Sequence, residues 1–192
     1  MILPIVAYGA AVLRKVGADI TPDYPRLEQL IADMWETMYA SNGVGLAAPQ
    51  INKDIRLFVM DSAQIFEHLE EEEKKQYSDV PGIKKVFINA HIKELNGHEW
   101  AYNEGCLSIP NIREDISRPA EVVLEYMDEQ FQQYKETFTG LSARIILHEY
   151  DHIDGKLFID YLKPLKKKML QGKLTDISKG KTKVDYKMIF IK

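Results

Sequence analysis

One short motif constrains this chain more than any other feature: residues 147–152 read Leu-His-Glu-Tyr-Asp-His. Residues four apart lie on the same face of a helix, so His148 and His152 can direct both imidazoles at one ion, provided that this segment is helical. Glu149 follows the first histidine, where its carboxylate can reach a water molecule on that ion without joining the ligand pair. The motif therefore predicts a helix that carries the metal site of a hydrolase.

A catalytic site of this kind needs a third protein ligand, and the only cysteine is the best candidate. The five histidines are at positions 68, 91, 98, 148 and 152, so none follows the motif. Cys106 lies upstream in the segment 103–108, Asn-Glu-Gly-Cys-Leu-Ser. A thiolate suits two imidazoles on a borderline-soft divalent ion, although a lone cysteine is more commonly a small buried hydrophobe. The predicted ligands are Cys106, His148 and His152.

A third segment, 43–50, reads Gly-Val-Gly-Leu-Ala-Ala-Pro-Gln and follows an expected helix. Two glycines and a proline favour a bent chain whose backbone is open to a ligand. The segment ends in Gln50, which supplies a neutral amide donor. By itself, this segment indicates only a turn.

Together, these three segments resemble the peptide deformylase family. Its motifs are Gly-x-Gly-x-Ala-Ala-x-Gln, Glu-Gly-Cys-x-Ser and His-Glu-x-x-His, and all three occur here in that order. The opening residues 2–9 are also similar to the family's amino terminus, so the resemblance spans residues 2–163. Two departures are Leu147, where relatives often have Gln, and residues 62–82, which look like an insertion. Neither departure involves a ligand or the base.

The resemblance implies hydrolysis of the N-formyl group from the N-terminal methionine of newly made polypeptides, with release of formate. Glu149 is the expected general base and then general acid. The side chain of Gln50 and the backbone N–H of Leu107 are the expected donors to the oxyanion. The resemblance also implies one divalent ion, iron(II) in the cell, with zinc, nickel or cobalt as possible replacements.

Two kinds of contact with the substrate are expected. An apolar pocket would hold the methionine side chain, and backbone groups would pair with the peptide as an added strand. Arg113 is expected to reach the peptide beyond the cleavage point, and a solvated arginine is the alternative. The candidates are Val44, Gly45, Gly105, Arg113, Leu141 and Ile145. Glu104 and Arg118 are expected to support the ligands from behind, with Arg118 paired to Asp151; a plain surface pair is the alternative.

Hydrophobic periodicity predicts the surrounding fold. Residues 25–40 have apolar side chains at helical spacing, and the expected strands are 56–60, 86–90, 121–127 and 131–138, the last two joined by a turn at 128–130. The motif helix is expected to begin near Gly140 with Thr139 as its cap, and Gly155 is placed to end it. This pattern predicts an α+β fold in which antiparallel strands pack around a central metal-binding helix carrying the His-Glu-x-x-His motif.

Charge divides the 192-residue chain into an expected catalytic domain, 1–163, and a basic C-terminal extension, 164–192. From Lys163 onward, ten lysines face two aspartates, a formal charge of +8 that leaves −12 on the rest of the chain. Four glutamates at 70–73 contribute to that acidity and are expected to be solvated. The extension is either a solvated end or a surface that contacts the ribosome through RNA phosphates.

Composition also predicts the environment of the protein. No apolar run approaches the roughly 18 residues that span a bilayer, and the amino terminus lacks a basic leader. A single cysteine forms no internal disulfide, and as a thiolate it favours a reducing compartment. We therefore expect a cytoplasmic protein with neither membrane nor DNA as a partner.

Three other classes remain open at this point. A general metallopeptidase would cleave internal peptide bonds, which a deformylase leaves intact. A nucleophilic hydrolase would use Cys106 directly and need no metal. A structural metal site would need a fourth protein ligand, and no further cysteine or histidine lies in a motif-like setting.

Overall fold

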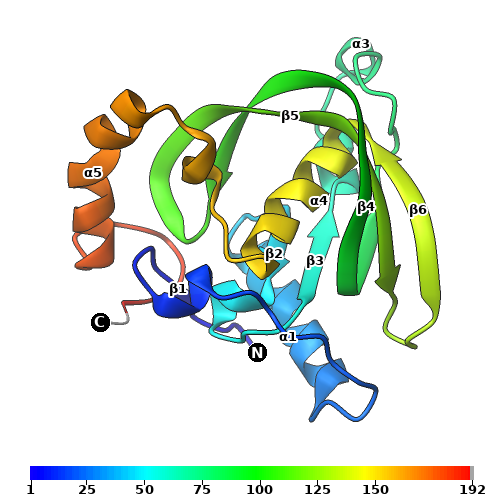
Figure 1. The fold of residues 1–192 in the computed structure, drawn as a ribbon, viewed down its shortest axis with the longest axis horizontal. Helices are drawn as coiled ribbons and strands as arrows, with labels where there is room; N and C mark the ends of the chain where they lie inside the picture. The colour runs from blue at the N-terminus through cyan, green and yellow to red at the C-terminus, as the bar shows by residue number, and fades with distance from the viewer. Residues whose placement is uncertain (191–192) are drawn as a thin grey trace.

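A five-stranded antiparallel sheet organises the fold, and the computed structural model describes residues 1–190 (Figure 1). Each strand pairs with its neighbour in the chain, so the sheet order follows the sequence order. The strands are β2 (Gly45–Ala47), β3 (Leu57–Asp61), β4 (Lys84–Cys106), β5 (Ile109–Met127) and β6 (Gln133–Thr139). The expectation of a mixed α and β fold with antiparallel strands is confirmed.

The β4–β5 hairpin is much longer than predicted. The predicted strands 86–90 and 121–127 cover only its base, where the side chains are largely buried. Its outer part is polar and exposed, and it is extended because the two strands pair with each other rather than because of its own residues. The pairing register shifts at four places. Such irregularities bend strands, and Figure 1 shows β4 and β5 curving over helix α4.

Helix α1 (Leu27–Ala40) begins two residues later than predicted, because Arg26 adopts a left-handed conformation with φ of 55°. Its buried face repeats every three or four residues, as expected for an amphipathic helix. That face packs with β2 and β3 into one core cluster; its fully packed residues are Leu27, Ile31, Met34 and Met38.

Helix α4 (Gly140–Ile153) packs against β2, β3, β5 and β6, and 11 of its 14 residues are buried. The prediction that Thr139 caps this helix is wrong, because its side chain makes no capping hydrogen bond. Asp79 does so instead: its carboxylate accepts hydrogen bonds from the N–H of Leu141 (3.2 Å) and of Ser142 (2.7 Å). Gly155 follows the helix with φ of 71°, the left-handed conformation expected there.

The segment 62–82, which is expected to be an insertion, holds two short helices, α2 (Ala63–Glu67) and α3 (Glu71–Lys74). The four glutamates at 70–73 are exposed, as expected. The segment is nevertheless attached to the core at both ends, because Phe66 is buried and Asp79 caps α4. The insertion is therefore part of the support of α4.

The C-terminal part of the chain returns to the N-terminal part. A short 3-10 helix, Phe158–Tyr161, leads into α5 (Pro164–Ser178), which buries Leu170, Leu174 and Ile177. Strand β7 (Met188–Ile189) then pairs in parallel with β1 (Ile5–Val6). The last two residues of the predicted extension 164–192 lie outside the described residues. No helix within residues 1–190 is long and apolar enough to cross a membrane.

Candidate metal centre and active-site cleft

Two elements bring the three predicted ligands together. Cys106 ends β4, while His148 and His152 lie one turn apart on α4. One ligand atom from each residue lies within 4.8 Å of the other two, and Cys106 Sγ is 3.2 Å from His152 Nε2. A thiolate and two imidazoles at this separation match the donor set of a site for a borderline-soft divalent ion.

A buried ion network holds the first of these histidines. Glu104 accepts a hydrogen bond from His148 Nδ1 at 2.9 Å, which leaves Nε2 of that ring for a metal. The same carboxylate accepts two hydrogen bonds from Arg118, at 2.7 and 3.0 Å, and one from Arg144 at 3.0 Å. Burial alone would raise the pKa of Glu104, but the hydrogen bonds from His148 and Arg118 outweigh it and hold the pKa well below its usual range. Glu104 is therefore an anion that orients the imidazole.

Arg118 extends this network to the far side of the motif. Its Nη1 donates to Asp151 at 2.7 Å, and Tyr161 donates to the other oxygen of Asp151 at 2.9 Å. Arg118 is only 3% exposed, so the alternative of a plain surface pair is wrong. Buried charges of this kind must be paired, and the pairs connect β5 to α4.

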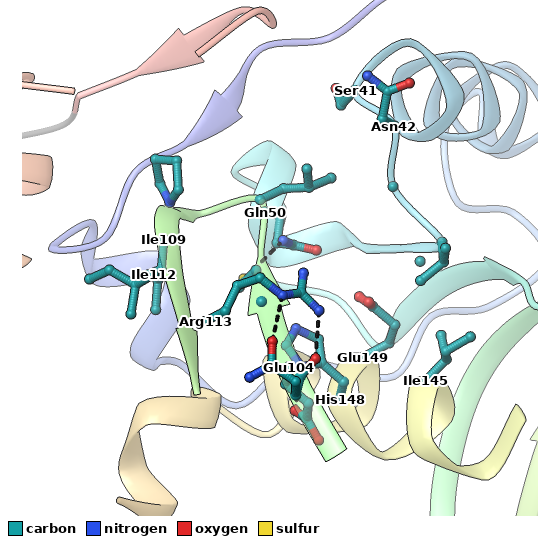
Figure 2. Close-up of a pocket in the computed structure, with 18 of the residues that line it drawn as sticks. Ser41, Asn42, Gln50, Glu104, Ile109, Ile112, Arg113, Ile145, His148 and Glu149 are labelled. Atoms are coloured by element: carbon teal, nitrogen blue, oxygen red, sulfur yellow. Dashed lines mark hydrogen bonds and ion pairs between the residues drawn. The ribbon is translucent and has the colours of Figure 1, made fainter. Parts of the chain in front are cut away.

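Glu149 points from α4 into the cavity beside the ligands (Figure 2). Burial raises the pKa of its carboxyl to about 7. Its Oε2 has no hydrogen-bond partner within residues 1–190. Any side chain at Gly45 would collide with this carboxylate, which explains why the chain has glycine there. A buried carboxyl with one free oxygen is suited to accepting and returning a proton near neutral pH.

Gln50 lies on the short 3-10 helix Ala48–Ile51, on the facing side of the cavity (Figure 2). Its Oε1 accepts a hydrogen bond from the N–H of Ala47 at 2.9 Å, which directs the amide nitrogen inward. That nitrogen is 3.6 Å from Cys106 Sγ and 3.4 Å from Ser108 Oγ. Leu107, between those two residues, also lines the cavity. Both predicted oxyanion donors thus lie close to Cys106.

A cavity of about 680 Å³ contains all of the predicted substrate contacts. Figure 2 shows Ile145 on α4 and Arg113 on the facing strand β5. Arg113 donates to the side-chain and backbone oxygens of Asn103, so it is held in place beside Gly105. The residues that the structure brings together here are Val44, Gly45, Gly105, Arg113, Leu141 and Ile145.

Several residues of the cavity were missed from the sequence. Ile65 of the insertion lies beside the predicted methionine pocket, and Tyr102 and Arg144 also line the wall. The C-terminal residues 183–186 contribute another part of the lining. Ile65 and residues 183–186 reach the cavity from segments remote from the three motifs, so no motif marks them. Tyr102 and Arg144 lie within four residues of Glu104 and His148, but they are not part of the motif patterns themselves.

The family model described as "Polypeptide deformylase" matches residues 2–168. Peptide deformylase of Christiangramia forsetii is 54% identical, over 99% of this chain and 96% of its own length. Peptide deformylase of Flavobacterium johnsoniae is 53% identical with the same coverage. The family model and both relatives span all three motifs, and the two relatives also cover the C-terminal segment.

Solved structures agree with these relatives. Peptide deformylase from Plasmodium falciparum superposes with a TM-score of 0.77 at 32% identity, covering 92% of this chain and 95% of that one. Arabidopsis thaliana peptide deformylase 1B gives a TM-score of 0.79 at 30% identity, covering 93% and 92%. With a matching family model, close relatives and the same fold, this chain belongs to the peptide deformylase family.

Proposed function

We propose a residue-level account of how this chain performs the reaction of its family. Members of the family are metallohydrolases that remove the N-formyl group from the N-terminal methionine of nascent polypeptides, and this chain does the same. One observation carries the account: the ligand atoms of Cys106, His148 and His152 lie within 4.8 Å of one another, and Glu149 and Gln50 line the same cavity as Cys106 and His148.

The donor set fits one divalent ion held by Cys106, His148 and His152. The three ligand atoms lie close enough for a single ion, and Glu104 already occupies the other nitrogen of His148. We propose iron(II) as the ion in the cell, with zinc, nickel or cobalt as replacements that suit the same ligands. When bound, the ion supplies Lewis acidity that makes water a nucleophile at neutral pH.

Glu149 is the proposed general base and general acid. Its carboxylate takes a proton from the attacking water and later returns it to the leaving amine. The attack on the formyl carbon produces a tetrahedral oxyanion, to which the Gln50 amide and the Leu107 N–H donate hydrogen bonds. Such donors stabilise the transition state because they are already oriented, and the Ala47 N–H keeps the Gln50 amide in this orientation.

The substrate's methionine side chain is proposed to lie among Val44, Leu141 and Ile145, next to Ile65 of the insertion. Backbone groups at Val44, Gly45 and Gly105 would pair with the peptide as an added strand. Arg113 lines the same cavity from β5 and is proposed to contact the peptide beyond its first residues. A formyl carbon bears only hydrogen beside its oxygen, so a tight site admits it and excludes larger acyl groups.

We also propose that α4 is the central metal-binding helix of the fold. Its contacts with β2, β3, β5 and β6, together with its two histidines, support this role. Residues 1–163 then form the catalytic domain, and 164–192 form a basic extension that packs on it through α5.

The test is release of formate from formyl-Met-Ala-Ser by protein purified without oxygen, with metal analysis of the same sample. We expect turnover with about one metal per chain and no cleavage of unformylated peptides. Activity that persists in fully metal-free protein would favour direct attack by Cys106. Failure of a fully metallated sample to release formate would overturn the proposed function.

Glu149→Gln tests the base directly. The amide keeps the size of the side chain but cannot take a proton, so kcat should fall by roughly a hundredfold or more while metal content is retained. Glu67→Gln on α2 is the matched control, since Glu67 is exposed. Near-normal turnover of Glu149→Gln at full metal content would exclude Glu149 as the base.

The basic extension is proposed to contact the ribosome, where formylated chains emerge. Its lysines are mostly exposed on α5 and after it, as phosphate contacts require. Because α5 also buries apolar residues, charge reversal is a cleaner test than truncation. Lys168, Lys173 and Lys179 changed to Glu should weaken ribosome binding at low salt, whereas Lys53→Glu and Lys75→Glu should not; equal effects would reject the contact.

A cytoplasmic location remains a proposal of the same kind. It is supported by the substrate class and by the need of a thiolate ligand for a reducing compartment. Cell fractionation followed by immunodetection tests it, and recovery of the protein outside the cytoplasmic fraction would overturn it.

A further inference from the structure

The turn between β4 and β5 contains only two residues, Leu107 and Ser108, and their outward carbonyls need partners from elsewhere in the fold. The N–H of Tyr8 donates to the carbonyl of Ser108 at 2.8 Å. The hydroxyl of Tyr186 donates to the carbonyl of Leu107 at 2.7 Å. The N-terminal and C-terminal segments therefore each hold one peptide group of the turn that follows Cys106.

Tyr186 is itself held firmly by the fold. Its ring packs against the core cluster of α1 and β3. Upstream, Asn111 donates from its side chain to Thr182 Oγ1 and to the carbonyl of Lys183, both at 3.2 Å. Downstream, the N–H of Ile5 donates to the carbonyl of Lys187 at 2.9 Å. The segment between these attachments lines the cavity, so its tyrosine is a fixed donor at the edge of the site.

We propose that Tyr186 is a positioning residue for deformylation: it holds the Leu107 carbonyl and thereby orients the turn that presents Cys106 and the Leu107 N–H. This inference rests on the proposed function of Leu107. The Leu107 carbonyl belongs to the Leu107–Ser108 peptide group, and the Leu107 N–H belongs to the peptide group before it. The two groups are joined at the Leu107 Cα, so a carbonyl held in place restrains how the second group can rotate relative to the first. A hydrogen bond on that carbonyl restrains the rotation before substrate arrives, as preorganised catalysis requires.

The other contacts of the turn do not involve the Leu107 carbonyl, which Tyr186 holds. The side chain of Leu107 abuts Gly43, where a Cβ would lie 2.9 Å from Leu107 Cδ1. Gln50 and Tyr8 both act on Ser108, on its hydroxyl and its carbonyl. Tyr186 is the side-chain donor on the Leu107 carbonyl, so its hydroxyl is the group to remove.

Tyr186→Phe removes that hydroxyl and keeps the ring. We expect kcat for formyl-Met-Ala-Ser to fall roughly tenfold, less than the hundredfold or more expected for loss of an oxyanion donor itself. KM should stay within about twofold, because the methionine pocket is untouched. In the cobalt(II)-substituted protein, the thiolate-to-metal absorption band should shift, since Cys106 adjoins the turn. Tyr24→Phe is the matched control, because Tyr24 packs on the same core cluster away from the cavity.

A second variant keeps the test independent of the Tyr186 ring. Asn111→Gly releases the upstream attachment and tolerates the left-handed backbone of that residue, φ 62°. It should lower kcat in the same direction by a smaller factor. The proposal is wrong if Tyr186→Phe has the same kcat as the wild type and Tyr24→Phe. It is also wrong if Tyr186→Phe changes KM alone.

Failure of the proposed function gives a different result. A metallated wild type that releases no formate would overturn that function whatever Tyr186 does. The cobalt band then decides the positioning role by itself: a shift in Tyr186→Phe but not in Tyr24→Phe supports it, and identical bands reject it.

Discussion

Helices α4 and α5 have nearly the same length but opposite surroundings. In α4, 11 of 14 residues are buried, whereas α5 buries only Leu170, Leu174 and Ile177 among its 15. Figure 1 shows α4 beneath the curved strands and α5 at the periphery. Burial, rather than helical pattern, therefore determines the role of the side chains on these two helices.

The charged side chains around the two helices also differ in burial. Around α4, Glu104, Arg118 and Asp151 are each less than 10% exposed and satisfy one another. On α5, Lys166 pairs with Glu114 while its side chain is 45% exposed. Buried charges position neighbouring groups, whereas exposed lysines contribute mainly to the electrostatic field of the surface.

The largest difference should come from the buried network. Arg118→Ala leaves two carboxylates without their common partner, so the free energy of unfolding should fall by about 3–5 kcal/mol. Lys166→Ala, which breaks the exposed pair of α5, should cost about 1 kcal/mol or less. Urea unfolding of the two variants measures both values. If the two variants lose similar free energies of unfolding, burial does not explain the difference between the helices.

Capping should produce an intermediate effect. Asp79 caps α4 from the insertion, whereas the residue preceding α5, Lys163, makes no side-chain cap. Asp79→Ala should lower the free energy of unfolding by about 1 kcal/mol and speed amide exchange at Ser142. Ser78→Ala is the control, because Ser78 contacts Thr139 rather than the helix N–H groups. If Ser78→Ala lowers the free energy of unfolding by the same amount, loss of the cap does not explain the effect of Asp79→Ala.

The smallest change in the free energy of unfolding is expected at Asp160, which lies between α4 and α5 in the chain. Burial raises the pKa of this carboxyl, but hydrogen bonds from Arg14 and from the Leu157 N–H outweigh it and lower the pKa below its usual value. A lowered folded-state pKa adds stability above the unfolded value of about 3.9, and that stability disappears as pH falls through the folded value.

Asp160→Asn should therefore be less stable than the wild type at pH 6, by roughly 1 kcal/mol or less because the pair is partly exposed. The difference should shrink as pH falls from about 4 toward 2. Urea unfolding at pH 6, 4 and 3 follows it. A difference that stays constant across this range would assign the effect to packing rather than to charge.

The site was more predictable from the sequence than the fold around it. His148 and His152 are one helical turn apart whatever surrounds the helix, so their common face follows from the motif. Residues 91–106 of β4 and 109–120 of β5 are not predicted, because their extended state comes from pairing with each other. Thr139 was assigned as the cap of α4 from its position, but the carboxylate of Asp79, 61 residues from Gly140, had the better access.

The order of residues along the chain is enough to predict the chemistry of the site: two imidazoles at helical spacing, one thiol, one carboxylate beside them and one amide after a glycine-rich turn. The fold adds supporting groups from elsewhere in the chain, namely Asp79 on α4, Arg144 on Glu104 and Tyr186 on the Leu107 carbonyl. Local spacing is dictated by backbone geometry, and a motif therefore records it. Long-range contacts depend on how distant segments pack together, and no local pattern encodes that arrangement.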